Sequence, residues 1–234
     1  MDASREAERE FVQERSIIIA ELDIEQVNQF KYLGSYIQAN NDCEPEIQAR
    51  ISSAYSAAGS LSGLLRSRLL SRGTKLKIYT TVIRPIAMYG SEVWAMTRRL
   101  EAKVDSFENN ILKTICGPVY DQDLNIWRRR YAREVRALTR LPLISSMIRA
   151  GRLRWAGHVI RADDARDIKQ VFLWRPDGRR PRGRPRTRWW DNVREDLTLL
   201  DEDPDDFANL AADRSGWRAL VSAAKTLRRV PEPD

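Results

Sequence analysis

The spacing of apolar residues predicts that most of this chain is helical. From about Pro45 onward, apolar side chains recur every three or four positions, as on one face of an amphipathic helix. Pro85 is expected to kink the second helix, because proline lacks the N–H that a helix interior needs. We predict helices over residues 45–65, 74–96, 100–115, 125–141, 143–160, 165–174, 189–200 and 207–227.

Only the front of the chain has a strand-like pattern. Residues 17–19 are three consecutive isoleucines, and residues 27–38 alternate loosely between apolar and polar side chains. Together they predict one β-hairpin within residues 16–38, preceded by a charged lead-in over residues 1–15. Because an isolated hairpin is only marginally stable, we expect it to pack on another element.

Positive charge is concentrated in the middle of the chain. The 234 residues have a formal net charge of +7. Residues 51–200 carry 30 basic and 14 acidic side chains, a net charge of +16, whereas residues 1–50 and 201–234 have net charges of −6 and −3. A basic middle between acidic ends favours a polyanionic partner over a small acidic substrate.

The most basic stretch is an arginine-rich arm, residues 175–188. It contains seven arginines and no lysine, and its three prolines favour an extended backbone. Arginine binds phosphate through paired hydrogen bonds and stacks on bases, and Trp189 and Trp190 follow directly. An arginine arm beside exposed aromatic residues is typical of single-strand or RNA-binding surfaces. The alternative is a basic tail whose two tryptophans begin a core helix.

Two of the predicted helices continue this basic character. Residues 125–141 carry six arginines, and residues 143–160 add Arg152 and Arg154, so we expect them to share an electropositive groove with the arm. A solvent-exposed charged face is the alternative. Either Trp189 or Trp190 is the better stacking residue, because two adjacent helical residues cannot both face the core fully. The tryptophans expected in the core are Trp94, Trp127, Trp155 and Trp174.

No cofactor or metal site is predicted. Cys43, Cys116 and His158 are the only thiols and the only imidazole, whereas a structural zinc site usually takes four such ligands at short spacing. The chain has no P-loop, no dinucleotide-binding glycine motif and no serine in a nucleophile elbow. His158 is expected either to be buried and hydrogen-bonded or to face a phosphate.

Two acidic patterns contain the residue types of catalytic sites. Asp163 and Asp164 mimic the paired aspartates of a polymerase, but two-metal catalysis needs a further carboxylate on a neighbouring strand. A helix stop capped by Asp163 is favoured instead. Asp167, Lys169 and Asp177 have the residue types of a restriction-like nuclease, but in reversed order and without an evident strand.

The sequence gives no sign of secretion or membrane insertion. The N-terminus is charged from Asp2 onward, and no apolar run approaches the roughly 20 residues that span a bilayer. The two cysteines lie in unlike contexts and do not form a disulfide framework. We therefore expect a soluble intracellular protein, in the nucleus or the cytoplasm, with no membrane partner.

Six short phrases occur in the order found in one known family. Together they resemble the C-terminal part of a non-LTR (LINE-type) retrotransposon reverse transcriptase, over residues 17–220. The phrases are Phe30-Lys31-Tyr32-Leu33-Gly34-Ser35; Glu46-Ile47, Arg50-Ile51, Ala54 and Ala57; Tyr79, Val82-Ile83, Pro85 and Tyr89-Gly90-Ser91-Glu92-Val93-Trp94; Arg152-Leu153-Arg154-Trp155-Ala156-Gly157-His158-Val159-Ile160-Arg161; Gly183-Arg184-Pro185, Arg188-Trp189 and Asp191; and Ala212-Asp213-Arg214 with Trp217-Arg218.

The resemblance implies a role for each part of the chain. The hairpin near residues 30–34 corresponds to the end of the polymerase palm, and residues 45–115 correspond to the thumb, which cradles the template–primer duplex. The region from Asn125 onward corresponds to a connector that binds RNA or target DNA. We therefore expect a mostly α fold: a thumb-like helical bundle with one N-terminal β-hairpin over residues 16–118, followed by a basic helical C-terminal module over residues 122–228.

The resemblance also implies that the catalytic centre is missing. In this family the polymerase aspartates lie upstream of the phrase that begins at Phe30, and the residues before Phe30 contain no aromatic-x-Asp-Asp. We therefore expect no enzymatic activity, but a remnant that binds RNA, an RNA–DNA hybrid or target DNA. The alternatives are a protein-interaction or scaffold role, through surface left exposed by the missing palm, and an element fragment without a selected function.

Binding is expected to depend on phosphate neutralisation and aromatic stacking, with little readout of sequence. The residues predicted to bind nucleic acid are Arg128, Arg129, Arg133, Arg136, Arg152, Arg154, His158, Arg161, Arg179, Arg180, Arg182, Arg184, Arg186, Arg188 and Trp189.

Overall fold

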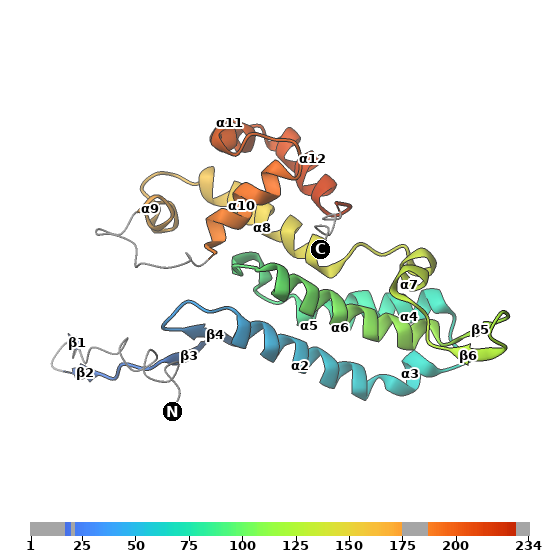
Figure 1. Cartoon of the computed structure of the whole chain (residues 1–234). Helices are drawn as coiled ribbons and strands as arrows, with labels where there is room; N and C mark the ends of the chain where they lie inside the picture. Colours follow the sequence, from blue (N-terminus) through green and yellow to red (C-terminus); the bar gives the residue numbers. More distant parts are fainter. Residues whose placement is uncertain (1–16, 20–21, 175–186, 228–234) are drawn as a thin grey trace, which may run out of the picture. The chain divides into compact units, whose positions relative to one another are not determined.

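A computed structural model describes residues 17–19, 22–174 and 187–227 (Figure 1). The chain forms two compact units, residues 1–42 and 43–234. The described residues of the first unit form short strands, and those of the second form mostly helices, so the predicted mostly helical class is confirmed. The functional division into modules over residues 16–118 and 122–228 stays a prediction.

The first unit contains two hairpins where one was predicted. Residues 27–38 form a hairpin of their own because Leu33 and Gly34, with φ angles of 47° and 86°, make a two-residue left-handed turn. Such a turn matches the twist of a tight β-hairpin and closes it locally, with Phe30 opposite Ile37. The four strands are β1 (Ile17–Ile19) paired with β2 (Leu22–Ile24), and β3 (Gln29–Tyr32) paired with β4 (Ser35–Gln38).

The second unit begins with helices that enclose a first hydrophobic core. Ile47, Tyr79, Phe107 and Leu112 are almost fully buried in it. The elements are α2 (Glu44–Ser60), α3 (Ser62–Arg66), α4 (Arg72–Ile78), the π-helix η1 (Tyr79–Ile83), α5 (Arg84–Ala87), the 3₁₀ turn η2 (Ser91–Val93) and α6 (Arg98–Cys116).

The predicted helix over residues 74–96 is shorter and more irregular than expected. Pro85 has no N–H and crowds the carbonyl of Thr81, which lies in the π-helical turn of η1. The helix therefore widens before Pro85 and ends at Ala87. Gly90 then takes a positive φ of 69°, which turns the chain into η2.

The buried carboxylate of Glu108 joins four segments around this core. It accepts hydrogen bonds from the Tyr79 hydroxyl at 2.7 Å, from Arg84 Nη2 at 2.6 Å and from Arg136 Nη1 at 2.6 Å. The backbone N–H of Ile144 donates to the same carboxylate at 3.1 Å. Two guanidinium groups and two neutral donors thus compensate one buried charge.

The predicted helix over residues 125–141 is only partly helical. Its start forms the second strand of a hairpin whose first strand precedes this range, because Asn125 adopts a φ of 55° and reverses the chain. Arg128 then bridges Asp121 at 2.6 Å and Glu134 at 2.8 Å, which ties the hairpin to the following helix. The elements are β5 (Val119–Asp121), β6 (Ile126–Arg128) and α7 (Ala132–Thr139).

A second core lies between the C-terminal helices, and α8 (Ile144–Ile160) contributes to both cores. Ile148 of α8 is buried in the first core, and Leu153, little more than one turn later, is buried in the second. The remaining elements are α9 (Asp167–Leu173), α10 (Trp189–Thr198), the 3₁₀ turn η3 (Pro204–Asp206), α11 (Phe207–Ala212) and α12 (Arg214–Ala224).

The last predicted helix, over residues 207–227, is divided at Asp213. This residue has an extended backbone with φ −73° and ψ 99°, and its carboxylate accepts the Ser215 N–H at 2.9 Å. An aspartate in this position caps a new helix start. The break lets α11 and α12 pack separately on α8. None of the described helices is long and apolar enough to cross a membrane.

Candidate nucleic-acid interface

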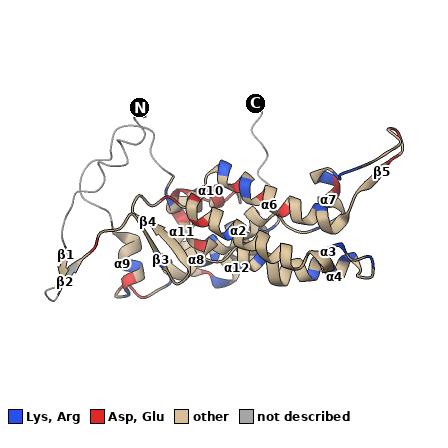
Figure 2. Cartoon of the chain, turned by 90° about the horizontal axis from the view of Figure 1, so that it is seen from below, with Lys and Arg blue, Asp and Glu red and all other residues tan. Residues whose placement is uncertain are grey.

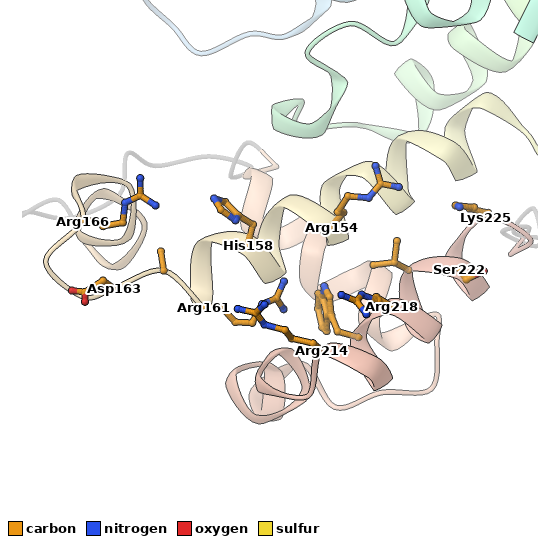
Figure 3. Close-up of a pocket in the computed structure, with 12 residues that line it drawn as sticks. Arg154, His158, Arg161, Asp163, Arg166, Arg214, Arg218, Ser222 and Lys225 are labelled. Carbon is orange, nitrogen blue, oxygen red and sulfur yellow. The ribbon is translucent and has the colours of Figure 1, made fainter. Parts of the chain in front are cut away.

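A basic pocket of about 650 Å³ lies between α8 and α12 (Figure 3). Three segments contribute its walls: the second half of α8 with the turn that follows it, the residue before α9, and one face of α12. The lining residues are Arg154, His158, Arg161, Ala162, Asp163, Arg166, Arg214, Trp217, Arg218, Val221, Ser222 and Lys225.

Helical spacing explains why these cations face one pocket. Arg214 and Arg218 are four residues apart on α12, and Lys225 follows seven residues later, so all three fall on one face. On α8, Arg154 and His158 are likewise four residues apart. Figure 3 shows Arg161, in the turn after α8, beside Arg214 and Arg218 of α12.

A glycine allows α12 to pack closely on α8 below this pocket. The Trp217 ring lies directly on Gly157, and a Cβ atom there would be 2.2 Å from Trp217 Nε1. The same Nε1–H donates to the Leu153 carbonyl oxygen at 3.1 Å, and Trp217 is 3% exposed. Trp217 therefore supports the pocket from below and fixes the distance between its two helical walls.

The electrostatics of the pocket favour an anion. Arg161 is half-buried and donates to the Ala211 carbonyl oxygen at 2.7 Å. Burial lowers the pKa of Arg161, and the nearby charges of Arg214 and Arg218 lower it further. Among the described lining residues the one carboxylate belongs to Asp163. A phosphate group would relieve the repulsion between these guanidinium groups and accept hydrogen bonds from them.

His158 faces this pocket and is exposed, so the predicted buried alternative is wrong. Its ring stacks on Trp155, with 5.3 Å between centroids and an interplanar angle of 29°. Trp155 thereby supports the imidazole from one side. The structure thus brings together three of the predicted residues, Arg154, His158 and Arg161.

Two predicted binding residues are instead buried ion-pair partners. Arg152 is 1% exposed, and with Arg149 it binds the Asp196 carboxylate at 2.7 and 2.9 Å. Arg136 is 8% exposed and binds Glu108. Both arginines stabilise the packing of helices, since carboxylates that are distant in sequence neutralise them in the core.

Trp189 is also packed rather than free to stack. Its indole N–H donates to the Glu92 carbonyl oxygen at 2.7 Å, and its ring meets Phe172 edge-on. Arg188 before it is exposed, and its backbone N–H donates to Asp191 at 2.8 Å. The other predicted residues of the arm lie outside the described residues: Arg179, Arg180, Arg182, Arg184 and Arg186.

The remaining predicted arginines lie near the β5–β6 hairpin. Arg128 is half-buried in its ion pairs, whereas Arg129 and Arg133 are exposed. The core assignment of the tryptophans holds for Trp94, which is 3% exposed. It is wrong for Trp127 and Trp174, which are 69% and 66% exposed.

Sequence reasoning missed four of the six arginine and lysine side chains that line the pocket: Arg166, Arg214, Arg218 and Lys225. The last three belong to the acidic end of the chain, whose net charge of −3 conceals the basic face of one helix. The four-residue spacing of Arg214 and Arg218 was the available signal. Reading charge along one helical face, instead of over a long window, would have found it.

The paired aspartates Asp163 and Asp164 lie just after α8 ends, as expected for a helix stop. The Asp163 carboxylate accepts the Ala165 N–H at 2.9 Å just after α8 ends, and Asp164 binds Lys169 at 2.6 Å. Within the part of the chain that the structure describes, no group of three or more histidine, cysteine, aspartate or glutamate side chains is arranged to hold a metal ion.

Comparison with known proteins finds a distant relative of this chain. The chain is 26% identical over 202 residues to an uncharacterised transposon-derived protein of Caenorhabditis elegans, which covers 85% of this chain and 71% of the relative. The chain is a homologue of a transposon-derived protein. No protein-family model matches it, and no solved structure does.

Proposed function

We propose that this transposon-related chain binds nucleic acid, as a remnant of a non-LTR reverse transcriptase that has no polymerase chemistry of its own. One observation carries the proposal: among the described residues that line the pocket there are five arginines and one lysine but a single carboxylate. The homology to a transposon-derived protein and the resemblance of six ordered phrases to a reverse transcriptase support the same assignment.

The pocket acts on the phosphate backbone. Arg214 and Arg218 lie on one face of α12 and Lys225 follows its last residue, so these three contact successive phosphates, and Arg154 and His158 contact them from α8. Each neutralised phosphate releases counterions, which makes binding strongly salt-dependent and largely independent of sequence. Trp217 is buried below the cations and does not stack on bases.

The test is an Arg214→Ala/Arg218→Ala double variant. Binding to single-stranded RNA, duplex DNA and an RNA–DNA hybrid is measured at several salt concentrations. We expect weaker binding to every probe and a salt slope that is smaller by up to about two units. A preference of the wild-type chain for RNA or the hybrid supports the reverse transcriptase origin, whereas equal binding to all polyanions contradicts it.

The matched control is Arg99→Ala/Arg194→Ala, which removes two surface arginines that pair with Glu44 and Asp205. It changes the net charge by the same amount but leaves the pocket intact. An equal loss of binding in both double variants would overturn the proposal, because only the total charge would then matter.

A second function, protein interaction, is favoured by the apolar surface of the first unit. Phe30 and Ile37 pair across β3 and β4 and are 58% and 52% exposed, and Leu33 at the turn is 76% exposed. Such a surface is typical of an interaction site. If it binds a second copy of the chain, Phe30→Asp/Ile37→Asp abolishes concentration-dependent association in light scattering and leaves nucleic-acid binding unchanged. A wild-type chain that stays monomeric at all concentrations would exclude this self-association.

A further inference from the structure

A second basic pocket, of about 580 Å³, lies in the same unit beside the β5–β6 hairpin. Figures 1 and 2 both show α3, α4 and this hairpin at one end of the unit. Among its described lining residues there is no aspartate or glutamate. The lining comprises Arg66, Ser67, Arg68, Leu70, Lys75, Lys113, Thr114, Ile115, Cys116, Gly117, Pro118, Arg129 and Arg130.

The six described cations of this pocket come from three places in the chain: the stretch from the end of α3 through α4, the end of α6, and the segment after β6. Lys75 is only 9% exposed, and among the described residues no ion pair joins it to a carboxylate. The Nε atom of Arg130 is buried without a hydrogen-bond partner in the described structure. A buried guanidinium donor without an acceptor, beside a buried lysine without an ion pair, favours the binding of an anion here.

An exposed aromatic pair stands next to this pocket. Tyr120 and Trp127 lie opposite each other on β5 and β6, with 5.5 Å between ring centroids. Trp127 is 69% exposed and Tyr120 is 42% exposed. The lining residues Pro118 and Arg129 are each two positions along the chain from this pair, a distance of about 7 Å in an extended strand.

The pair is held on a fixed support. Arg128, on the other face of β6, is bound by Asp121 and Glu134, and its guanidinium lies 4.3 Å from the centre of the Tyr131 ring. The Arg128 side chain and the Tyr131 N–H lower the pKa of Glu134 from 4.5 to about 2, so this carboxylate is charged at neutral pH. Trp127 is therefore presented to solvent by a braced hairpin and contributes little buried area to the fold.

We propose that this pocket and the aromatic pair form a second binding site for single-stranded nucleic acid, with a phosphate in the pocket and an adjacent base stacked on Trp127. The proposal rests on the proposed nucleic-acid function and adds a separate site to it. An unpaired base exposes its flat face to an indole ring, whereas the bases of a duplex are already stacked on one another. The site therefore selects single strands over duplexes.

The first test is Trp127→Ala, measured as affinity for a short labelled polyuridine and for a duplex of the same length. Loss of one base–aromatic stack should weaken single-strand binding by roughly tenfold. The salt slope should not change, because stacking neutralises no phosphate. Duplex binding should stay as in the wild-type chain, and Trp127→Phe should retain most of the single-strand affinity.

The complementary variant, Arg68→Ala/Lys113→Ala, should reduce the salt slope for polyuridine by up to about two units. Leu124→Ala, an exposed residue of the same hairpin, is the matched control and should bind normally. In addition, polyuridine should slow the alkylation of Cys116, which lines the pocket, relative to Cys43, as followed by peptide mass spectrometry.

The outcomes separate the two sites. If Trp127→Ala binds polyuridine as the wild-type chain does, the second site is wrong, and the proposed function still stands provided Arg214→Ala/Arg218→Ala weakens binding. Equal alkylation of Cys116 with and without polyuridine would likewise contradict the proposal that a phosphate binds in this pocket. If Trp127→Ala binds weakly and the α12 double variant binds normally, the second site is the main interface and the first pocket is not.

Discussion

Arg152 and Arg154 are two residues apart on α8, but Arg152 is buried and Arg154 is exposed. The Arg152 side chain is buried against Asp196, whereas the Arg154 side chain is exposed in the basic pocket. A separation of two residues turns a helical side chain to nearly the opposite face. The sequence predicts that both are basic helical positions. Which of the two is buried depends on Asp196, a carboxylate that lies 44 residues away from Arg152 along the chain.

Gly157 provides a residue-scale prediction about how the pocket is built. Gly157→Ala places a methyl group against the Trp217 ring, so α12 must move away from α8, and we expect a destabilisation of about 1–3 kcal/mol. The measurement is urea unfolding followed by circular dichroism.

The control is Gly151→Ala in the same helix, where an added Cβ meets nothing within 4 Å. That change should stabilise the protein by about 0.5–1 kcal/mol, because alanine loses less entropy in a helix. If both variants behave alike, close packing of Trp217 on α8 does not constrain the fold.

At the scale of elements, the sequence predicted the regular helices well and the junctions poorly. Residues 100–115 and 143–160 were predicted within a few residues of α6 and α8, because their apolar periodicity is uninterrupted. The β5–β6 hairpin was missed, since three consecutive arginines and spaced apolar residues look helical in isolation. Asn125 in the left-handed region and the bridge from Arg128 to Asp121 stabilise the strand pair, and periodicity reports neither.

Glu108 tests how the elements of the first core are joined. Glu108→Gln keeps the shape of the side chain but leaves Arg84 and Arg136 buried without a counter-ion, so we expect a loss of about 3–5 kcal/mol. The free energy of unfolding is measured by urea titration at neutral pH.

Glu44→Gln is the matched control for this change. Glu44 pairs with Arg99 and Lys103 at the surface, where water and salt screen the interaction, so its loss should cost far less than that of Glu108. A similar cost at both positions would mean that Glu108 does not organise the four segments that contact it.

For the whole molecule, net charge and charge placement lead to different conclusions. The basic middle of the chain predicted a polyanion partner, yet several of its arginines neutralise buried carboxylates, as Arg84, Arg136 and Arg149 do. Conversely, the acidic C-terminal end supplies Arg214 and Arg218 to the basic pocket. Composition led to a proposed class of partner, which stays a prediction, but it did not indicate the surface, because ion pairs between distant segments decide which charges remain available.

The arginine arm, residues 175–188, is expected to add to nucleic-acid binding by the whole molecule. It links α9 to α10 along the sequence, and its seven arginines are expected to neutralise phosphates of a bound polyanion. Changing Arg182, Arg184 and Arg186 to alanine should weaken binding to every nucleic acid and reduce the salt slope by up to about three units. The triple lysine variant keeps the charge and should keep most of the slope. A slope that is unchanged in the alanine variant would restrict the interface to the folded helices, because an arm that neutralises no phosphate releases no counterions.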